Sequence, residues 1–353
     1  MMLEQAFKSK SNNFDILRIF ASLMVLSSHS YALTKANHEP FVEFLGYDTG
    51  GVWGVSIFFV ISGFLVTRSA LERNVSDYLK SRILRIVPAL VIVSVFDVFV
   101  IGLLFTSLPA KRFFSDPQTW GHLKNGLVFT MDMFLPGVFE GNPEKAVNGS
   151  LWTLPIECSF YIILPILYVL GLLRRNCFFL LPCATAIIYI IGVTKLGWSW
   201  NEQGGSLFMA VPTYVAVKNG LFFLLGGCLW IYRDFVPLDD GLAICCILLL
   251  IISRLHDSKW VVYFISVPYL TIYLALAHPV LTKFYHKIGD LSYGTYIFAF
   301  PIQQALVASL GAEIGPITLT LIATPLTLVM AALSWHFIER QAMAFRHKIP
   351  AHR

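Results

Sequence analysis

The stretch 14–34, FDILRIFASLMVLSSHSYALT, is long and apolar enough to cross a membrane, yet it carries an arginine and a histidine. Arg18 and His29 lie eleven residues apart, which is close to three helical turns and about 16 Å along a helix. Both side chains therefore point to roughly the same side of one helix. Ionisable groups inside a span are costly and usually mark a cavity or a reaction site. The pair is the first candidate for an active site.

Composition places the whole chain among helical membrane proteins. Of its 353 residues, 56% are hydrophobic and only 13% are charged, whereas a soluble domain has about 25% charged residues. Because the apolar residues form long blocks, we expect an all-α, polytopic membrane protein with about ten transmembrane helices around a polar core. We expect one membrane domain over residues 1–353 and no cleavable signal peptide. The expected spans are 14–34, 52–71, 83–107, 152–172, 177–196, 210–232, 241–254, 260–279, 290–310 and 316–338.

The positive charges predict the orientation of these spans. Of the 26 lysine and arginine residues, 17 fall at the termini and in segments on the same side of the membrane. Such an excess is typical of cytoplasmic segments, so we expect both termini in the cytoplasm and the long loop 108–150 outside. The net charge of +5 then requires no nucleic-acid partner. The six cysteines include no C-x-x-C pair, and we expect small buried hydrophobes and no metal site.

Two groups of residues in the first three spans could carry chemistry. Asp15 can pair with Arg18, three residues away, and a neutral imidazole at His29 can act as general base for a hydroxyl acceptor. Arg82 and Arg85, at the predicted entry to the third span, can face one cavity and bind phosphate. The structural alternatives are snorkelling by Arg18, a backbone hydrogen bond from His29, and ordinary positive charge at the cytoplasmic side.

Polar residues in the fourth and ninth spans form the other candidates. Glu157 lies inside the fourth span, where it could orient or charge-stabilise His29, or instead form a structural bridge to another span. In the ninth span, the side chains of Tyr293, Tyr296, Gln303 and Gln304 could line a polar cavity. Helix packing explains this stretch equally well. The motifs of soluble hydrolases, nucleotide-binding proteins and zinc proteases do not occur.

Taken in order, these motifs resemble the integral-membrane acyltransferase-3 family over residues 13–340. The motifs that carry the resemblance are Arg18 and His29 with ten residues between them, segment 53–65, the R-x-x-R motif of segment 82–88, segment 150–157 and segment 291–296. Two positions depart from the family pattern. Ala299 precedes Phe300-Pro301 where many members have a histidine, and Gln341 stands where many have a proline. A second catalytic histidine in the ninth span is therefore not expected.

The resemblance implies a single-domain enzyme of the bacterial cytoplasmic (inner) membrane that takes an acyl group, most often acetyl, from cytoplasmic acyl-CoA. The acceptor would be a hydroxyl of a cell-surface or lipid-linked carbohydrate, such as O-antigen or exopolysaccharide, entering under the loop 108–150. Arg18, Arg82 and Arg85 would meet the CoA phosphates, while His29 and Glu157 would be catalytic. No permanently bound cofactor is expected.

Two other functions fit the same spans. The acceptor could instead be a small-molecule sugar or peptidoglycan, because nothing in the spans separates these substrates. The protein could also be a non-catalytic transporter or exporter, which inverted repeats or broken helices in matching halves would favour. The sequence shows neither of these features.

Overall fold

The structure is a computed structural model that describes residues 1–9, 11–36, 38–198, 206–208, 211–256, 259–279 and 289–345. Within these ranges the chain is almost entirely helical, and the strands β1 (Ser206–Phe208) and β2 (Val211–Pro212) form one small antiparallel pair. Eight helical segments of the described chain are long and apolar enough to cross a membrane. The prediction of an all-α, polytopic membrane protein is confirmed.

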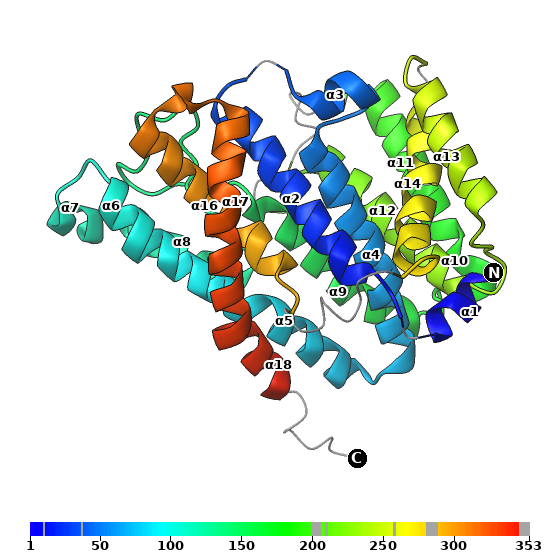
Figure 1. Ribbon diagram of the computed structural model, residues 1–353. Coiled ribbons are helices and arrows are strands. Elements are labelled where there is room, and N and C mark those ends of the chain that lie inside the picture. The colour runs from blue at the N-terminus through cyan, green and yellow to red at the C-terminus, as the bar shows by residue number, and fades with distance from the viewer. Residues whose placement is uncertain are drawn as a thin grey trace.

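Each of the ten predicted spans overlaps one long helix (Figure 1). Two of them differ from the others: α13 has only 14 residues, and α16 has 19 residues but contains the polar Gln303 and Gln304. The ten helices are α2 (Phe14–Leu33), α4 (Gly50–Glu72), α5 (Val75–Phe96), α9 (Leu154–Val169), α11 (Leu180–Lys195), α12 (Thr213–Ile231), α13 (Asp240–Ser253), α14 (Lys259–Leu276), α16 (Ser292–Leu310) and α17 (Pro316–Ser334).

Short helical segments connect or extend these long helices. Two of them, η1 and η5, are π-helical, and η2, η3 and η4 are 3₁₀ turns. The short segments are α1 (Leu3–Lys8), α3 (Pro40–Leu45), η1 (Asp97–Gly102), α6 (Leu103–Phe105), α7 (Ala110–Ser115), α8 (Pro117–His122), η2 (Leu123–Leu127), η3 (Leu151–Thr153), α10 (Arg175–Phe178), η4 (Ala312–Ile314), η5 (Trp335–Glu339) and α18 (Arg340–Phe345).

The third span begins earlier than the sequence analysis predicted. Asn74 is the N-cap of α5, and its side chain accepts a hydrogen bond from the backbone N–H of Asp77 at 2.8 Å. Such a cap satisfies one of the free donors at a helix start. Arg82 and Arg85 therefore lie inside α5, about two turns from its start, and not at its entry.

The centre of the molecule is a close crossing of α4 with α12, while α2 packs on α4, α16 and α17 (Figure 1). Glycines permit the first of these contacts. A Cβ atom on Gly63 would lie 1.9 Å from the backbone oxygen of Phe223, and one on Gly226 would lie 2.2 Å from that of Val60. Larger side chains would force the two helices apart, so small residues fix where they cross.

The segment predicted as a long external loop is folded against the end of α5. It contains α7, α8 and η2, and its apolar side chains pack on the π-helical turn η1. Its small core consists of Val98, Ile101, Phe113, Leu135, Val138, Phe139 and Val147.

The six cysteines are all free. Cys246 is buried, but Cys183 and Cys245 are exposed on α11 and α13. The expectation of buried cysteines is wrong for these two, because each lies on the outward face of its helix.

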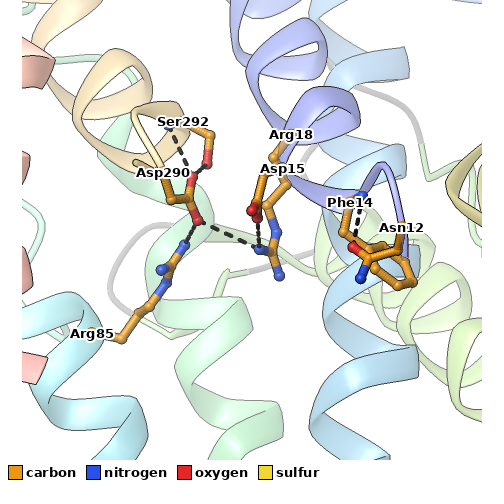
Figure 2. Close-up of polar contacts among 7 residues, drawn as sticks. All are labelled: Asn12, Phe14, Asp15, Arg18, Arg85, Asp290 and Ser292. Atoms are coloured by element: carbon orange, nitrogen blue, oxygen red, sulfur yellow. Dashed lines mark hydrogen bonds and ion pairs between the residues drawn. The ribbon is translucent and has the colours of Figure 1, made fainter. Parts of the chain in front are cut away.

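An ion-pair cluster joins three helices that are distant in sequence (Figure 2). Arg18 of α2 donates to Asp15 at 3.2 Å and to Asp290 at 3.4 Å, and Arg85 of α5 donates to the same oxygen of Asp290. The other oxygen of Asp290 accepts from the backbone N–H of Ser292 at 3.1 Å and from its hydroxyl. Asp290 is only 7% exposed and directly precedes α16. Its carboxylate thus holds α2 and α5 at the start of α16.

The charge of Asp290 depends on its two arginine partners. Burial by itself would raise the pKa of Asp290, but the guanidinium groups of Arg85 and Arg18 hold that pKa below its usual range. A carboxyl whose pKa is lower in the folded state than in the unfolded state adds stability above its unfolded pKa, and this stability is lost as the pH falls.

We therefore expect Asp290→Asn to lower the free energy of unfolding at pH 7 by on the order of 3 kcal/mol, because it leaves two partly buried guanidinium groups without their counter-charge. The difference in the free energy of unfolding between wild type and variant should shrink as the pH falls below about 4. In that range the Asp290 carboxyl of the unfolded wild-type chain becomes protonated. Thermal unfolding in detergent at several pH values measures both effects. As a matched control, Asp234→Asn removes an exposed ion pair with Arg175 and should change the midpoint temperature of thermal unfolding little. Equal effects of the two variants would contradict a structural role for Asp290.

Candidate active site

A cleft opens between α2, α4, α5, α9 and α16. All three arginines singled out from the sequence, Arg18, Arg82 and Arg85, line this cleft. Arg18 comes from the first turns of α2, and the other two lie one turn apart on α5. The fold therefore brings together positive groups from two helices on one wall of a cavity, where they can bind an anionic ligand.

The three arginines differ in what already binds them. Arg85 and Arg18 share Asp290, whereas Arg82 has no ion-pair partner among the described residues. The Arg82 guanidinium instead lies 5.7 Å from the ring centre of Tyr161, and its Nε donates to Ser81 at 3.3 Å. The charge of Arg82 is thus the least compensated of the three and the most available to a ligand.

Glu157 lies on another wall of the same cleft. Its Oε1 accepts hydrogen bonds from the hydroxyls of Ser62, at 2.6 Å, and Tyr161, at 2.5 Å. Farther along this wall, the hydroxyls of Thr153 and Tyr296 lie 2.7 Å apart. The lining of the cleft therefore combines three cationic groups with hydroxyl groups and a carboxylate.

His29 lies outside the lining of this cleft, at a different depth. Its ring contacts that of Phe300 edge to face, with ring centres 5.0 Å apart, and its Nδ1 is buried without a hydrogen-bond partner among the described residues. Tyr296 lines the cleft and Phe300 contacts His29, and these two residues are one turn apart on α16, about 6 Å along the helix axis. His29 is thus within a short distance of the deep end of the cleft.

The expectation that Glu157 orients His29 is not met. Glu157 binds Ser62 of α4, while Ser28, the neighbour of His29, contacts Gly51 of the same helix. Ser62 and Gly51 are eleven residues apart, or about 16 Å along α4. Antiparallel packing of α2 and α4 therefore puts Glu157 near the level of Arg18 and well away from His29.

The sequence analysis missed three residues of this region. The sequence indicated no role for Asp290, Asn148 or Phe300. The pattern Asp290-Leu291-Ser292 ahead of an apolar run is typical of a helix start, which could have indicated a fixed carboxylate. Nothing in the local sequence indicates that this carboxylate binds two distant arginines. In the part of the chain that the structure describes, no cluster of three metal-ligating side chains occurs.

Comparisons with known proteins identify the family of the chain. Residues 11–336 match the model of a protein family described as an acyltransferase domain, the acyltransferase-3 family. The chain is 30% identical to an O-acetyl transferase of Shigella phage Sf6 over 94% of its own length and 96% of that protein. It is also 27% identical to nodulation protein 10 of Rhizobium leguminosarum bv. viciae, over 97% of its own length and 96% of that protein.

A third relative is longer than this chain. The peptidoglycan O-acetyltransferase of Listeria monocytogenes is 27% identical, and the match covers 82% of this chain but 51% of that protein. No solved structure matches the chain significantly. The family match covers nearly the whole polytopic domain, including the arginine-lined cleft and His29, so the chain belongs to the acyltransferase-3 family of membrane acyltransferases.

Proposed function

We propose that this protein transfers an acyl group, most simply acetyl, from acyl-CoA to a carbohydrate hydroxyl. The observation that carries the proposal is the convergence of Arg18, Arg82 and Arg85 on one cleft, together with the position of His29, which contacts Phe300 one turn of α16 from the cleft residue Tyr296. The phosphates of CoA would bind the arginines, and the pantetheine arm would extend along the cleft past Tyr296. The thioester carbonyl would then lie beside the imidazole.

His29 would act as the general base in this mechanism. Its imidazole removes the proton from the acceptor hydroxyl while the hydroxyl oxygen attacks the thioester carbonyl. The C–S bond breaks, and the CoA thiolate leaves and takes up the proton. Because the site is enclosed by apolar residues such as Phe300, exclusion of water and positioning of the two substrates would supply much of the rate. Glu157, held by two hydroxyls, would act inside the donor cleft.

The acceptor would be a glycan outside the bacterial cytoplasmic membrane, lipid-linked or at the cell surface, such as O-antigen or exopolysaccharide. The phage relative is named as an O-acetyl transferase, which supports acetyl transfer to a hydroxyl. The Listeria relative is named as a peptidoglycan O-acetyltransferase, so peptidoglycan is the second acceptor class.

The direction of transfer requires a defined orientation in the membrane. We expect the end of α4 at Arg73 to face the cytoplasm and Glu144 to face outward, because the charge bias favours cytoplasmic arginines. Single cysteines at positions 73 and 144, in a background without the six native cysteines, should react with an impermeant maleimide from opposite sides of the membrane. Labelling of position 73 from outside would reverse the orientation and, with it, the direction of acyl transfer.

Donor binding should depend on the arginines of α5. Arg82→Ala should weaken acetyl-CoA binding by roughly 1–3 kcal/mol, the scale of a charge-assisted hydrogen bond, with little change in stability because Arg82 has no carboxylate partner among the described residues. Arg85→Ala should weaken binding as well and also destabilise the protein, because Asp290 loses a partner. Replacement of either arginine by lysine should restore little of the acetyl-CoA affinity, since lysine cannot bind phosphate bidentately.

Calorimetric titration of the purified variants with acetyl-CoA measures these affinities. Arg68→Ala is the matched control, because Arg68 pairs with Glu72 and packs on Phe7 outside the cleft. Wild-type affinity in the Arg82→Ala, Arg85→Ala double variant would show that these arginines only orient the protein in the membrane.

The central test concerns His29. Removal of a general base costs about 10²–10⁴-fold in rate, so His29→Gln should lose acetyl transfer and keep both acetyl-CoA binding and folding. Glutamine keeps hydrogen-bonding capacity but cannot accept the proton. Transfer of labelled acetyl from acetyl-CoA to a glycan extract of the host, per folded molecule, is the measurement. His38→Gln, a change at an exposed histidine, should have normal turnover. Near-normal turnover in His29→Gln would reject His29 as the general base.

A further inference from the structure

The helix that contacts His29 has a gap in its backbone hydrogen bonding. Pro301 lies inside α16 and has no N–H, so the carbonyl of Ile297, four residues earlier, loses its helical donor. The side chain of Asn148 replaces this donor: its Nδ2 lies 3.0 Å from the Ile297 oxygen. Both Asn148 and Ile297 are fully buried, so water cannot satisfy the carbonyl in their place.

Asn148 is itself held in one orientation. Its Nδ2 also donates to Asp97 at 3.2 Å, and its Oδ1 accepts from the backbone N–H of Ser150 at 3.3 Å. An amide nitrogen has two hydrogens, and both are used here on acceptors. Asp97 is fully buried at the start of the π-helical turn η1, where its Oδ2 also lies 3.4 Å from Nε2 of His122. A buried acid thus fixes the amide that completes α16.

The chain of contacts continues from Asn148 to the imidazole. The next residue, Gly149, packs against the ring of Phe300, because a Cβ atom at position 149 would lie 2.7 Å from Cζ of Phe300. The Phe300 ring in turn meets the His29 ring at an interplanar angle of 80°. Nδ1 of His29 has no hydrogen-bond partner among the described residues, so the orientation of the imidazole depends on packing, and the ring of Phe300 supplies one such contact.

We infer that Asn148, oriented by Asp97, is a positioning residue for His29. It closes the hydrogen-bond gap that Pro301 leaves in α16 and thereby holds Phe300 against the imidazole. The inference rests on the proposed role of His29 as the base. It assigns a catalytic contribution to two buried polar residues that touch neither the donor cleft nor the arginines.

The test separates positioning from folding by kinetics. Asn148→Leu keeps the side-chain volume approximately and removes the hydrogen bonds, and a misplaced catalytic group costs up to about 10²-fold in rate. With acetyl-CoA and host glycan extract as substrates, we expect kcat to fall at least tenfold and KM for acetyl-CoA to change less than twofold, because the cleft is intact. The rate at which diethylpyrocarbonate modifies His29, followed by mass spectrometry, should change as well. Asp97→Leu should give the same pattern.

Asn142→Leu is the matched control. Asn142 belongs to the same loop and donates to the backbone oxygen of Gln304 in α16 at 3.0 Å, one turn beyond Phe300. This variant should keep kcat within twofold of the wild-type value.

A second change should rescue the first. Pro301→Ala restores an N–H that can bind the Ile297 oxygen, so adding it to Asn148→Leu should recover most of the turnover that Asn148→Leu loses. If Asn148→Leu does not fold, Phe300→Leu, which keeps an apolar side chain but no ring, should show the same fall in kcat.

The outcomes separate this inference from the proposed function. Normal turnover in His29→Gln rejects the general base itself. An inactive His29→Gln together with normal turnover in Asn148→Leu and Phe300→Leu rejects only the positioning role. Equal losses in Asn148→Leu and Asn142→Leu, or no recovery by Pro301→Ala, would also overturn it, because the defect would then not act through the gap in α16.

Discussion

The site depends on one buried carboxylate, that of Asp290, placed between the guanidinium groups of Arg18 and Arg85. Charges in an apolar environment are tolerated only when they are paired and hydrogen-bonded. Asp290 satisfies this requirement for two arginines, and Ser292 satisfies its remaining oxygen. The same contacts fix α2 and α5 at the start of α16, so the pairing of the charges also determines the positions of three helices.

Helix α16 is held by polar contacts along its whole length. At its start lies Asp290, in its middle Asn148 binds the carbonyl freed by Pro301, and near its far end two glutamines bind neighbouring segments. Gln303 donates to the backbone oxygen of Leu26 at 2.8 Å and to Ser30 at 2.7 Å, which ties α16 to α2 on both sides of His29. A helix with so many side-chain contacts is well suited to carry the residues that separate the cleft from the imidazole.

The packing of α2 against α4 determines the depth at which each group of the site lies. Both helices span the region from Arg18 to His29, and their antiparallel packing orders the chemistry by depth. The arginines and Glu157 lie at one level, Tyr296 and Thr153 lie deeper, and Phe300 and His29 lie one turn farther. The proposed acyl-CoA donor would follow this order, with its phosphates at the arginines and its thioester end at the imidazole.

The sequence alone determined the helical membrane class and the approximate positions of the long helices, because hydropathy and length are local properties of the chain. It also determined that Arg18 and His29 share one helical side and that Arg18 can pair with Asp15, because the helical repeat fixes these relations. The tertiary structure alone decided which distant groups meet. Arg18 and Asp290 are 272 residues apart, and nothing in the local pattern of either segment selects the other. Glu157 was placed beside His29 because both are buried and ionisable, but depth in the membrane depends on how α4 packs between α2 and α9. Asn148 and Pro301 gave no local signal of their partnership, since a carbonyl without its donor is satisfied by whichever side chain the packing of the helices brings near.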